Sequence, residues 1–110
     1  MKDKAYVVGV GMVPFQKPSK SESYDVMATA ATRSALADAG LDYDKIQQAY
    51  VGYVYGDSTC GQRALYQVGM TGIPVMNVNN NCSTGSSALF LARQAVESGA
   101  VDCALALGFE

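Results

Sequence analysis

Short apolar runs alternate along the chain with segments that have the periodicity of an amphipathic helix. Short apolar runs at residues 5–11, 47–55, 75–79 and 102–108 predict four strands, and glycine- or proline-containing loops bound them. Apolar residues spaced three or four apart predict helices over about 24–39, 62–68 and 83–99. The resulting order, βαβαβαβ, predicts an α/β fold with a mostly parallel sheet and right-handed crossovers.

The third predicted helix is apolar on nearly every side. It carries Ala88, Leu89, Phe90, Leu91, Ala92, Ala95 and Val96, and such a helix is stable only when neighbours cover all its faces. Three helices and four strands do not easily supply that cover, and the last predicted strand is followed only by "FE". We therefore expect residues 1–110 to be one domain that forms the first, incomplete part of a larger fold.

Composition excludes several classes of function. The net charge is −2 without runs of like charge, which argues against a nucleic-acid surface. The start of the chain matches neither a secretory signal nor a membrane span. Three widely spaced cysteines fit reduced thiols better than a disulfide framework. The absence of histidine and of C-x-x-C pairs disfavours a metal site.

Cys82 is the candidate nucleophile. In "NVNNNCSTGSSALF", residues 77–90, it lies between a predicted strand end and a predicted helix start. The free N–H groups and the dipole of a helix N-terminus stabilise a thiolate and a developing oxyanion. The alternative is a buried cysteine that acts as a small apolar residue. Because the chain has no histidine, a base that activates Cys82 must lie outside these residues.

The other polar candidates have simpler interpretations. Cys60, in "GDSTCGQR", could be reactive, but the glycines and Ser58 around it more simply mark a strand-to-helix connection. Cys103, in an apolar strand, is expected in the core. Asn79, Asn80 and Asn81 either bond the loop backbone, which we favour, or line a pocket.

Several separated motifs resemble the thiolase superfamily. Residues 61–110 contain a Gly-x-Arg-Ala helix start, a Gly-x-Pro approach to a strand, Val-Asn-x-x-Cys-Ser-x-Gly-x-x-Ala, and a strand that ends in Gly-x-Glu. The stretches "YVYGDSTCGQRA" and "VNNNCSTGSSALF" are most similar to the sterol-carrier-protein branch of that family. The resemblance covers nearly the whole chain.

The resemblance implies an acyltransferase that cleaves 3-oxoacyl-CoA to acetyl-CoA or propionyl-CoA and a shortened acyl-CoA, in fatty-acid and sterol side-chain β-oxidation. Cys82 matches the acyl-accepting cysteine, and its backbone N–H matches one oxyanion donor. Acyl-CoA and CoA are then the partners, with CoA as co-substrate and no bound cofactor or metal. The family's histidine and second catalytic cysteine come from segments that this sequence lacks, so we expect the 110 residues alone to be inactive.

The resemblance also implies an architecture and a location. A thiolase subunit has two similar halves of βαβαβαββ type, and the helix after the nucleophile lies between their sheets. A homodimer would form through the strand around residues 75–79. The location would be peroxisomal, or otherwise cytoplasmic, although the chain carries no targeting signal. The alternatives are another condensing enzyme, of the ketoacyl synthase or 3-hydroxy-3-methylglutaryl-CoA synthase type, and a truncated non-catalytic module that binds lipid or acyl-CoA.

Overall fold

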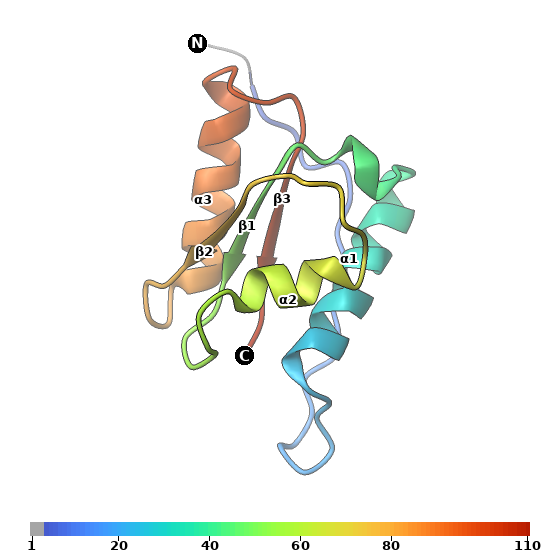
Figure 1. Cartoon of the computed structure of the whole chain (residues 1–110), viewed down its shortest axis with the longest axis vertical. Coiled ribbons are helices and arrows are strands. Elements are labelled where there is room, and N and C mark those ends of the chain that lie inside the picture. The colour runs from blue at the N-terminus through green and yellow to red at the C-terminus, as the bar shows by residue number, and fades with distance from the viewer. Residues whose placement is uncertain (1–3) are drawn as a thin grey trace.

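The computed structural model describes residues 4–110 and contains a parallel sheet of three strands (Figure 1). The strands are β1 (Gln48–Gly52), β2 (Val75–Val78) and β3 (Ala104–Gly108), and their order across the sheet is β2-β1-β3. The central strand pairs Ala49 with Val75 on one side and with Leu105 on the other. The prediction of an α/β fold with a parallel sheet is confirmed, and these three strands lie within or close to the predicted runs.

The helices also follow the sequence pattern. They are α1 (Tyr24–Ala39), α2 (Cys60–Tyr66) and α3 (Thr84–Glu97), with a short 3₁₀ turn, η1 (Tyr43–Lys45), before the sheet. Alanine-rich α1 ends at Gly40, whose φ of 69° is left-handed and closes the helix through hydrogen bonds to Ala37 and Leu36. None of the helices in the described part of the chain has both the length and the apolar character needed to span a bilayer.

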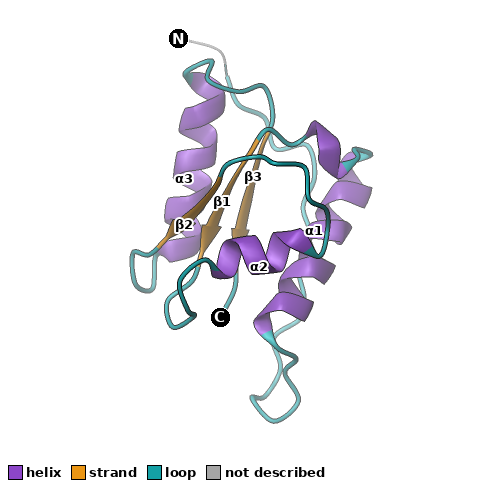
Figure 2. Cartoon of the chain, in the orientation of Figure 1, coloured by secondary structure: helices purple, strands orange, loops and turns teal. Residues whose placement is uncertain are grey.

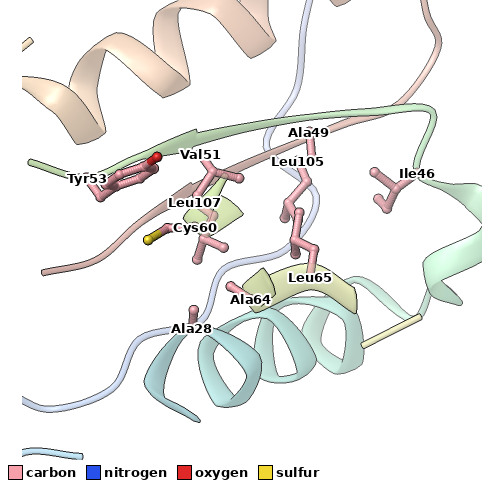
Figure 3. Packing of buried hydrophobic residues seen from close by; sticks show 10 residues of the cluster. All are labelled: Ala28, Ile46, Ala49, Val51, Tyr53, Cys60, Ala64, Leu65, Leu105 and Leu107. Atoms are coloured by element: carbon pink, nitrogen blue, oxygen red, sulfur yellow. The ribbon is translucent and has the colours of Figure 1, made fainter. Parts of the chain in front are cut away.

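The sheet separates α3 from α1 and α2, and the core cluster lies on the side of α1 and α2 (Figure 3). Larger side chains face α1 and α2, where they form a core of Ala28, Ile46, Ala49, Val51, Tyr53, Cys60, Ala64, Leu65, Leu105 and Leu107. On the face toward α3, β3 contributes only small residues, and α3 buries Ala88, Ala92 and Ala95. Because side chains alternate along a strand, the sequence of β3, "ALALG", puts leucine on one face and alanine or glycine on the other. This arrangement lets α3 approach the sheet closely.

The predicted first strand at residues 5–11 is wrong. This segment is extended but is loop in the structure (Figure 2), and Tyr6, Val7, Val8 and Val10 are exposed rather than buried. Its backbone lies against α1 instead of a strand. A side chain at Gly9 or Gly11 would collide with the backbone of α1, and Val10 N–H donates to Asp38 Oδ2 at 2.8 Å. An apolar run forms a strand only when a neighbouring strand pairs with it, and no described strand reaches this one.

Candidate functional site around Cys82

Cys82 lies in the connection between β2 and α3, two residues before the helix begins at Thr84. Its thiol is free and exposed, which agrees with the predicted placement at a strand-to-helix junction and rules out the alternative of a buried cysteine. Ser83 is the N-cap, and α3 then runs for 14 residues. The thiol is therefore held at the amino end of a helix that is long enough to have a substantial dipole.

Backbone N–H groups without an acceptor lie at the start of α3, beside Cys82 in the sequence. Within residues 4–110, no acceptor takes a hydrogen bond from the N–H of Cys82, Gly85 or Ser86. By contrast, the N–H groups of Ser83 and Thr84 are satisfied by the carbonyls of Asn80 and Asn81, each at 3.1 Å. Unpaired N–H groups at a helix start are donors to an anion. The Cys82 N–H, on the same residue as the sulfur, is free to bind an oxyanion that develops beside it.

Side chains as well as backbone fix the loop around Cys82. Asn80 N–H donates to Thr84 Oγ1 at 2.6 Å, and Asn80 Nδ2 donates to Ser87 Oγ at 2.9 Å. Ser83 Oγ donates to Asn80 O at 2.8 Å. Asn81 has a left-handed φ of 52°, a conformation that asparagine tolerates better than most residues. The preferred interpretation, that the asparagine side chains bond the loop backbone, is confirmed for Asn79, whose Oδ1 accepts the N–H of Asn81 at 3.0 Å. The Asn80 side chain instead bonds the side chain of Ser87 in α3.

Thr84 joins this loop to the sheet. It is 6% exposed, and an added Cβ at Gly52 would collide with its side chain. Gly52 is the last residue of the central strand β1, so the start of α3 rests directly on the middle of the sheet. The position of Cys82 is therefore tied through Thr84 to the most rigid part of the fold.

Cys60 and Cys103 lie away from this junction. Cys60 is the first residue of α2 and is 2% exposed, so it belongs to the core rather than to a reactive loop. A hydrogen bond with the Cys60 side chain, followed by burial, raises the pKa of the Tyr24 phenol. Cys103 precedes β3 and is only partly buried, which corrects its expected place in the core. Burial, followed by the neighbouring Asp102 charge, raises the pKa of the Cys103 thiol.

A groove of about 1060 Å³ lies elsewhere on the molecule. The N-terminal segment, α1, β3 and α3 line it, and Cys82 is not among its residues. It lies between the extended segment 4–16 and β3. Cys82 instead opens directly to solvent.

Two features near the site were missed by sequence reasoning. Asn77 Oδ1 accepts the N–H of Gly61 at 2.8 Å, which ties the start of α2 to β2. The Glu110 carboxylate accepts the N–H groups of Val54 at 2.8 Å and Tyr55 at 3.2 Å, and so holds the loop after β1. Both contacts join residues far apart in the sequence, and no local pattern signals such contacts.

Known proteins are similar to this chain in sequence and in fold. The model of the thiolase N-terminal domain matches residues 5–110. A sterol carrier protein 2 from Gallus gallus is 62% identical over 112 residues, which cover 100% of this chain and 20% of that protein. A benzoylsuccinyl-CoA thiolase subunit from Thauera aromatica is 36% identical over 109 residues, covering 97% of this chain and 28% of that subunit. The chain thus spans 20% to 28% of the length of these relatives.

A solved structure shows the same fold. Acetyl-CoA acetyltransferase from Syntrophomonas wolfei superposes with a TM-score of 0.83 and 21% identity, covering 92% of this chain and 27% of that one. At that identity the likeness bears on the fold alone, whereas the family model matches almost every residue of the sequence. The chain belongs to the thiolase family, as its N-terminal domain.

Proposed function

We propose that this chain supplies the acyl-accepting cysteine of an acyltransferase that cleaves 3-oxoacyl-CoA by thiolysis. The observation that carries the proposal is Cys82, an exposed thiol two residues before α3 whose own backbone N–H has no acceptor among the described residues. Membership in the thiolase family and the sterol carrier protein relatives support this choice among acyl-transfer reactions.

The reaction proceeds in two covalent steps. The Cys82 thiolate attacks the C3 carbonyl of the 3-oxoacyl-CoA, and the negative charge that develops on the carbonyl oxygen is stabilised by the free N–H of Cys82. The C2–C3 bond then breaks, the electron pair leaves with acetyl-CoA or propionyl-CoA as an enolate, and the enolate takes a proton. The thiol of a second CoA, losing its proton, attacks the thioester and restores the Cys82 thiolate.

The residues next to Cys82 in the sequence offer no general base for these proton transfers. The sequence has no histidine, and the side chains next to Cys82 are asparagine, serine and threonine. We therefore propose that the base and the acid belong to a longer protein that contains this chain. The chain by itself then carries the nucleophile and one oxyanion donor but does not turn over substrate.

A thiolysis assay tests the function. A longer protein that contains this chain, built to the length of the sterol carrier protein relatives, should cleave a 3-oxoacyl-CoA in the presence of CoA. Cys82→Ala should lower kcat by about a thousandfold or more, and Cys103→Ala, the matched control, should leave it within about twofold. Mass spectrometry should find the acyl group on Cys82. A Cys82→Ala protein that keeps its activity, or a 110-residue chain with cysteine-dependent turnover, would refute the proposal.

We also propose a homodimer through β2 and a peroxisomal location. β2 is an edge strand of the sheet, and Met76 on it is 43% exposed, which supports pairing with a second copy. Sedimentation of the longer protein should show a dimer, and Met76→Lys should weaken it. The peroxisomal location rests on the family resemblance of the sequence alone, and imaging the longer protein in cells tests it.

A further inference from the structure

The hydroxyl of Thr84 has an unusual position for a polar group. Thr84 is 6% exposed, and only one other polar residue of the described chain, Thr32, is buried to this degree. The two differ in one respect: Thr84 Oγ1 accepts the N–H of Asn80 at 2.6 Å, whereas Thr32 Oγ1 has no partner. The buried hydroxyl of Thr84 therefore has a specific contact, and that contact lies in the loop that carries Cys82.

Thr84 makes hydrogen bonds to the Cys82 loop with both its side chain and its backbone. Its Oγ1 takes the N–H of Asn80, two residues before Cys82, and its own N–H donates to Asn81 O at 3.1 Å. Cys82 lies between these anchor points. The ring that closes through Asn80 N–H and Thr84 Oγ1 thus encloses the backbone of Cys82 and fixes the direction in which the thiol projects.

The other side of Thr84 is fixed by the sheet. Its methyl group occupies the space that a side chain at Gly52 would need. Gly52 is paired with Val78 in β2 and Gly108 in β3, so it cannot move without disturbing both neighbouring strands. Thr84 is therefore held by packing on one side, and it holds the loop by hydrogen bonding on the other.

We propose that Thr84 is a positioning residue for Cys82, acting through its hydroxyl, which keeps the thiol beside the free N–H groups at the start of α3. This inference rests on the proposed function, in which Cys82 is the acyl acceptor. Thr84 does not touch the reacting atoms. When its hydroxyl is removed, Asn80 N–H loses its acceptor, the loop loosens, and the thiolate spends less time next to the N–H groups that stabilise it.

Alkylation of Cys82 tests the inference without any substrate. The rate of reaction with iodoacetamide is measured on the Cys82 peptide by mass spectrometry, over a range of pH, in the 110-residue protein. Thr84→Val keeps the shape of the side chain but removes the hydroxyl, and it should slow alkylation at neutral pH by about fivefold. Thr84→Ser keeps the hydroxyl and should restore the rate to within about twofold. Thr32→Val removes a buried hydroxyl without a partner and should change nothing at Cys82.

If Thr84→Val does not fold, a second pair of variants makes the same comparison. Thr84→Ser and Thr84→Ala both lack the methyl group that packs on Gly52 and differ from each other only in the hydroxyl. Circular dichroism establishes that each variant is folded before the rates are compared. Equal alkylation rates within the Val and Ser pair, or within the Ser and Ala pair, would overturn the inference.

Activity separates this inference from the proposed function. In the longer protein, Thr84→Val should lower kcat and leave KM unchanged, because the hydroxyl contacts the loop rather than the substrate. If the unmodified longer protein does not cleave 3-oxoacyl-CoA, the proposed function fails while the alkylation series still measures the effect of Thr84. If thiolysis is observed but Thr84→Val alkylates and turns over like the parent, only the positioning role fails.

Discussion

The side-chain oxygen Oδ1 of Asn77 accepts the backbone N–H of Gly61 at 2.8 Å, and so joins the first turn of α2 to β2. The other end of the same amide, Asn77 Nδ2, donates to Gln62 Oε1 at 2.7 Å, and Gln62 Nε2 donates to Val75 O at 3.1 Å. These bonds run between a helix that is only 7 residues long and an edge strand. Such a helix is not stable by itself in water, so its order depends on contacts of this kind.

Asn77→Ala should therefore destabilise the protein. It removes the acceptor of Gly61 N–H, a loss of about 1–2 kcal/mol in the free energy of unfolding. Asn77→Asp keeps an oxygen at the acceptor position and should cost less than alanine. Chemical denaturation of the three proteins checks this order, and equal stability of the alanine and aspartate variants would contradict the role of the Oδ1 acceptor.

Thr32→Val should stabilise the protein. Thr32 is 1% exposed on α1, and its hydroxyl has no hydrogen-bond partner among residues 4–110. Valine has the same shape without the buried polar atom, so the free energy of unfolding should rise by about 1 kcal/mol. Thr32→Ser keeps the hydroxyl, loses a methyl group and should be less stable than the parent. Thermal unfolding measures both, and a lower Tm for Thr32→Val would argue against the buried, unpaired hydroxyl.

The three thiols should react in a fixed order. Cys82 is exposed and should be labelled first by N-ethylmaleimide at neutral pH. Cys103 should be slower, because burial and, to a smaller extent, Asp102 raise its pKa and reduce the fraction of thiolate. Cys60 is 2% exposed and should be protected until the protein unfolds. Mass spectrometry of the labelled peptides over time gives the order of reaction. Labelling of Cys60 before the protein unfolds would contradict its position in the core.

Asp25 should make stability depend on pH in acid. Hydrogen bonds from Ser23 Oγ at 2.6 Å and Gln67 Nε2 at 2.9 Å lower the pKa of its carboxyl group. A carboxyl group whose pKa is lowered in the folded state stabilises the protein at pH values above its unfolded pKa of about 4. This stabilisation is lost as the pH falls through the folded pKa. Asp25→Asn removes the titrating group. The variant should lose less stability than the parent between neutral and acid pH, as followed by denaturation at a series of pH values; parallel curves would contradict the shift.

The outer face of α3 should bind an apolar dye. Leu89 is 55% exposed and Phe90 is 61% exposed, in agreement with the expectation that this helix needs cover on more sides than the sheet provides. Replacing both by glutamine should lower dye fluorescence and any self-association, which sedimentation detects. Ser86→Ala alters an exposed position of the same helix without removing apolar surface and serves as the control. A parent protein that stays monomeric without binding dye would contradict the expectation.

The elements that the sequence predicted well are those with a local cause. Gly40 ends α1 because a left-handed residue is required there, and the leucine–alanine alternation of β3 follows from the pleat of a strand. The junction at Cys82 was also predictable, since a strand pattern, asparagines and a helix pattern follow one another directly. Residues 5–11 have an equally strong apolar pattern, but a strand requires a partner, and a pattern does not supply one.

The contacts that hold Cys82 in place could not be predicted from the sequence. That Thr84 would accept the N–H of Asn80 depends on the turn that Asn81 makes, and that it would be buried depends on Gly52, more than thirty positions earlier in the numbering. Sequence reasoning found the candidate nucleophile, Cys82, from the residues next to it. It missed the residues that hold it, because they come together only when the sheet and α3 are assembled.

The docking of Gly9 and Gly11 onto α1 has a consequence for how the molecule opens. A strand in a sheet is protected by a ladder of hydrogen bonds that must break together, but this segment has the Val10–Asp38 bond and helix contact instead. Its amides should exchange with deuterium long before those of β1, and its release should not require the sheet to melt. We therefore expect residues 5–11 to open as a separate cooperative unit and to leave the junction that carries Cys82 in place.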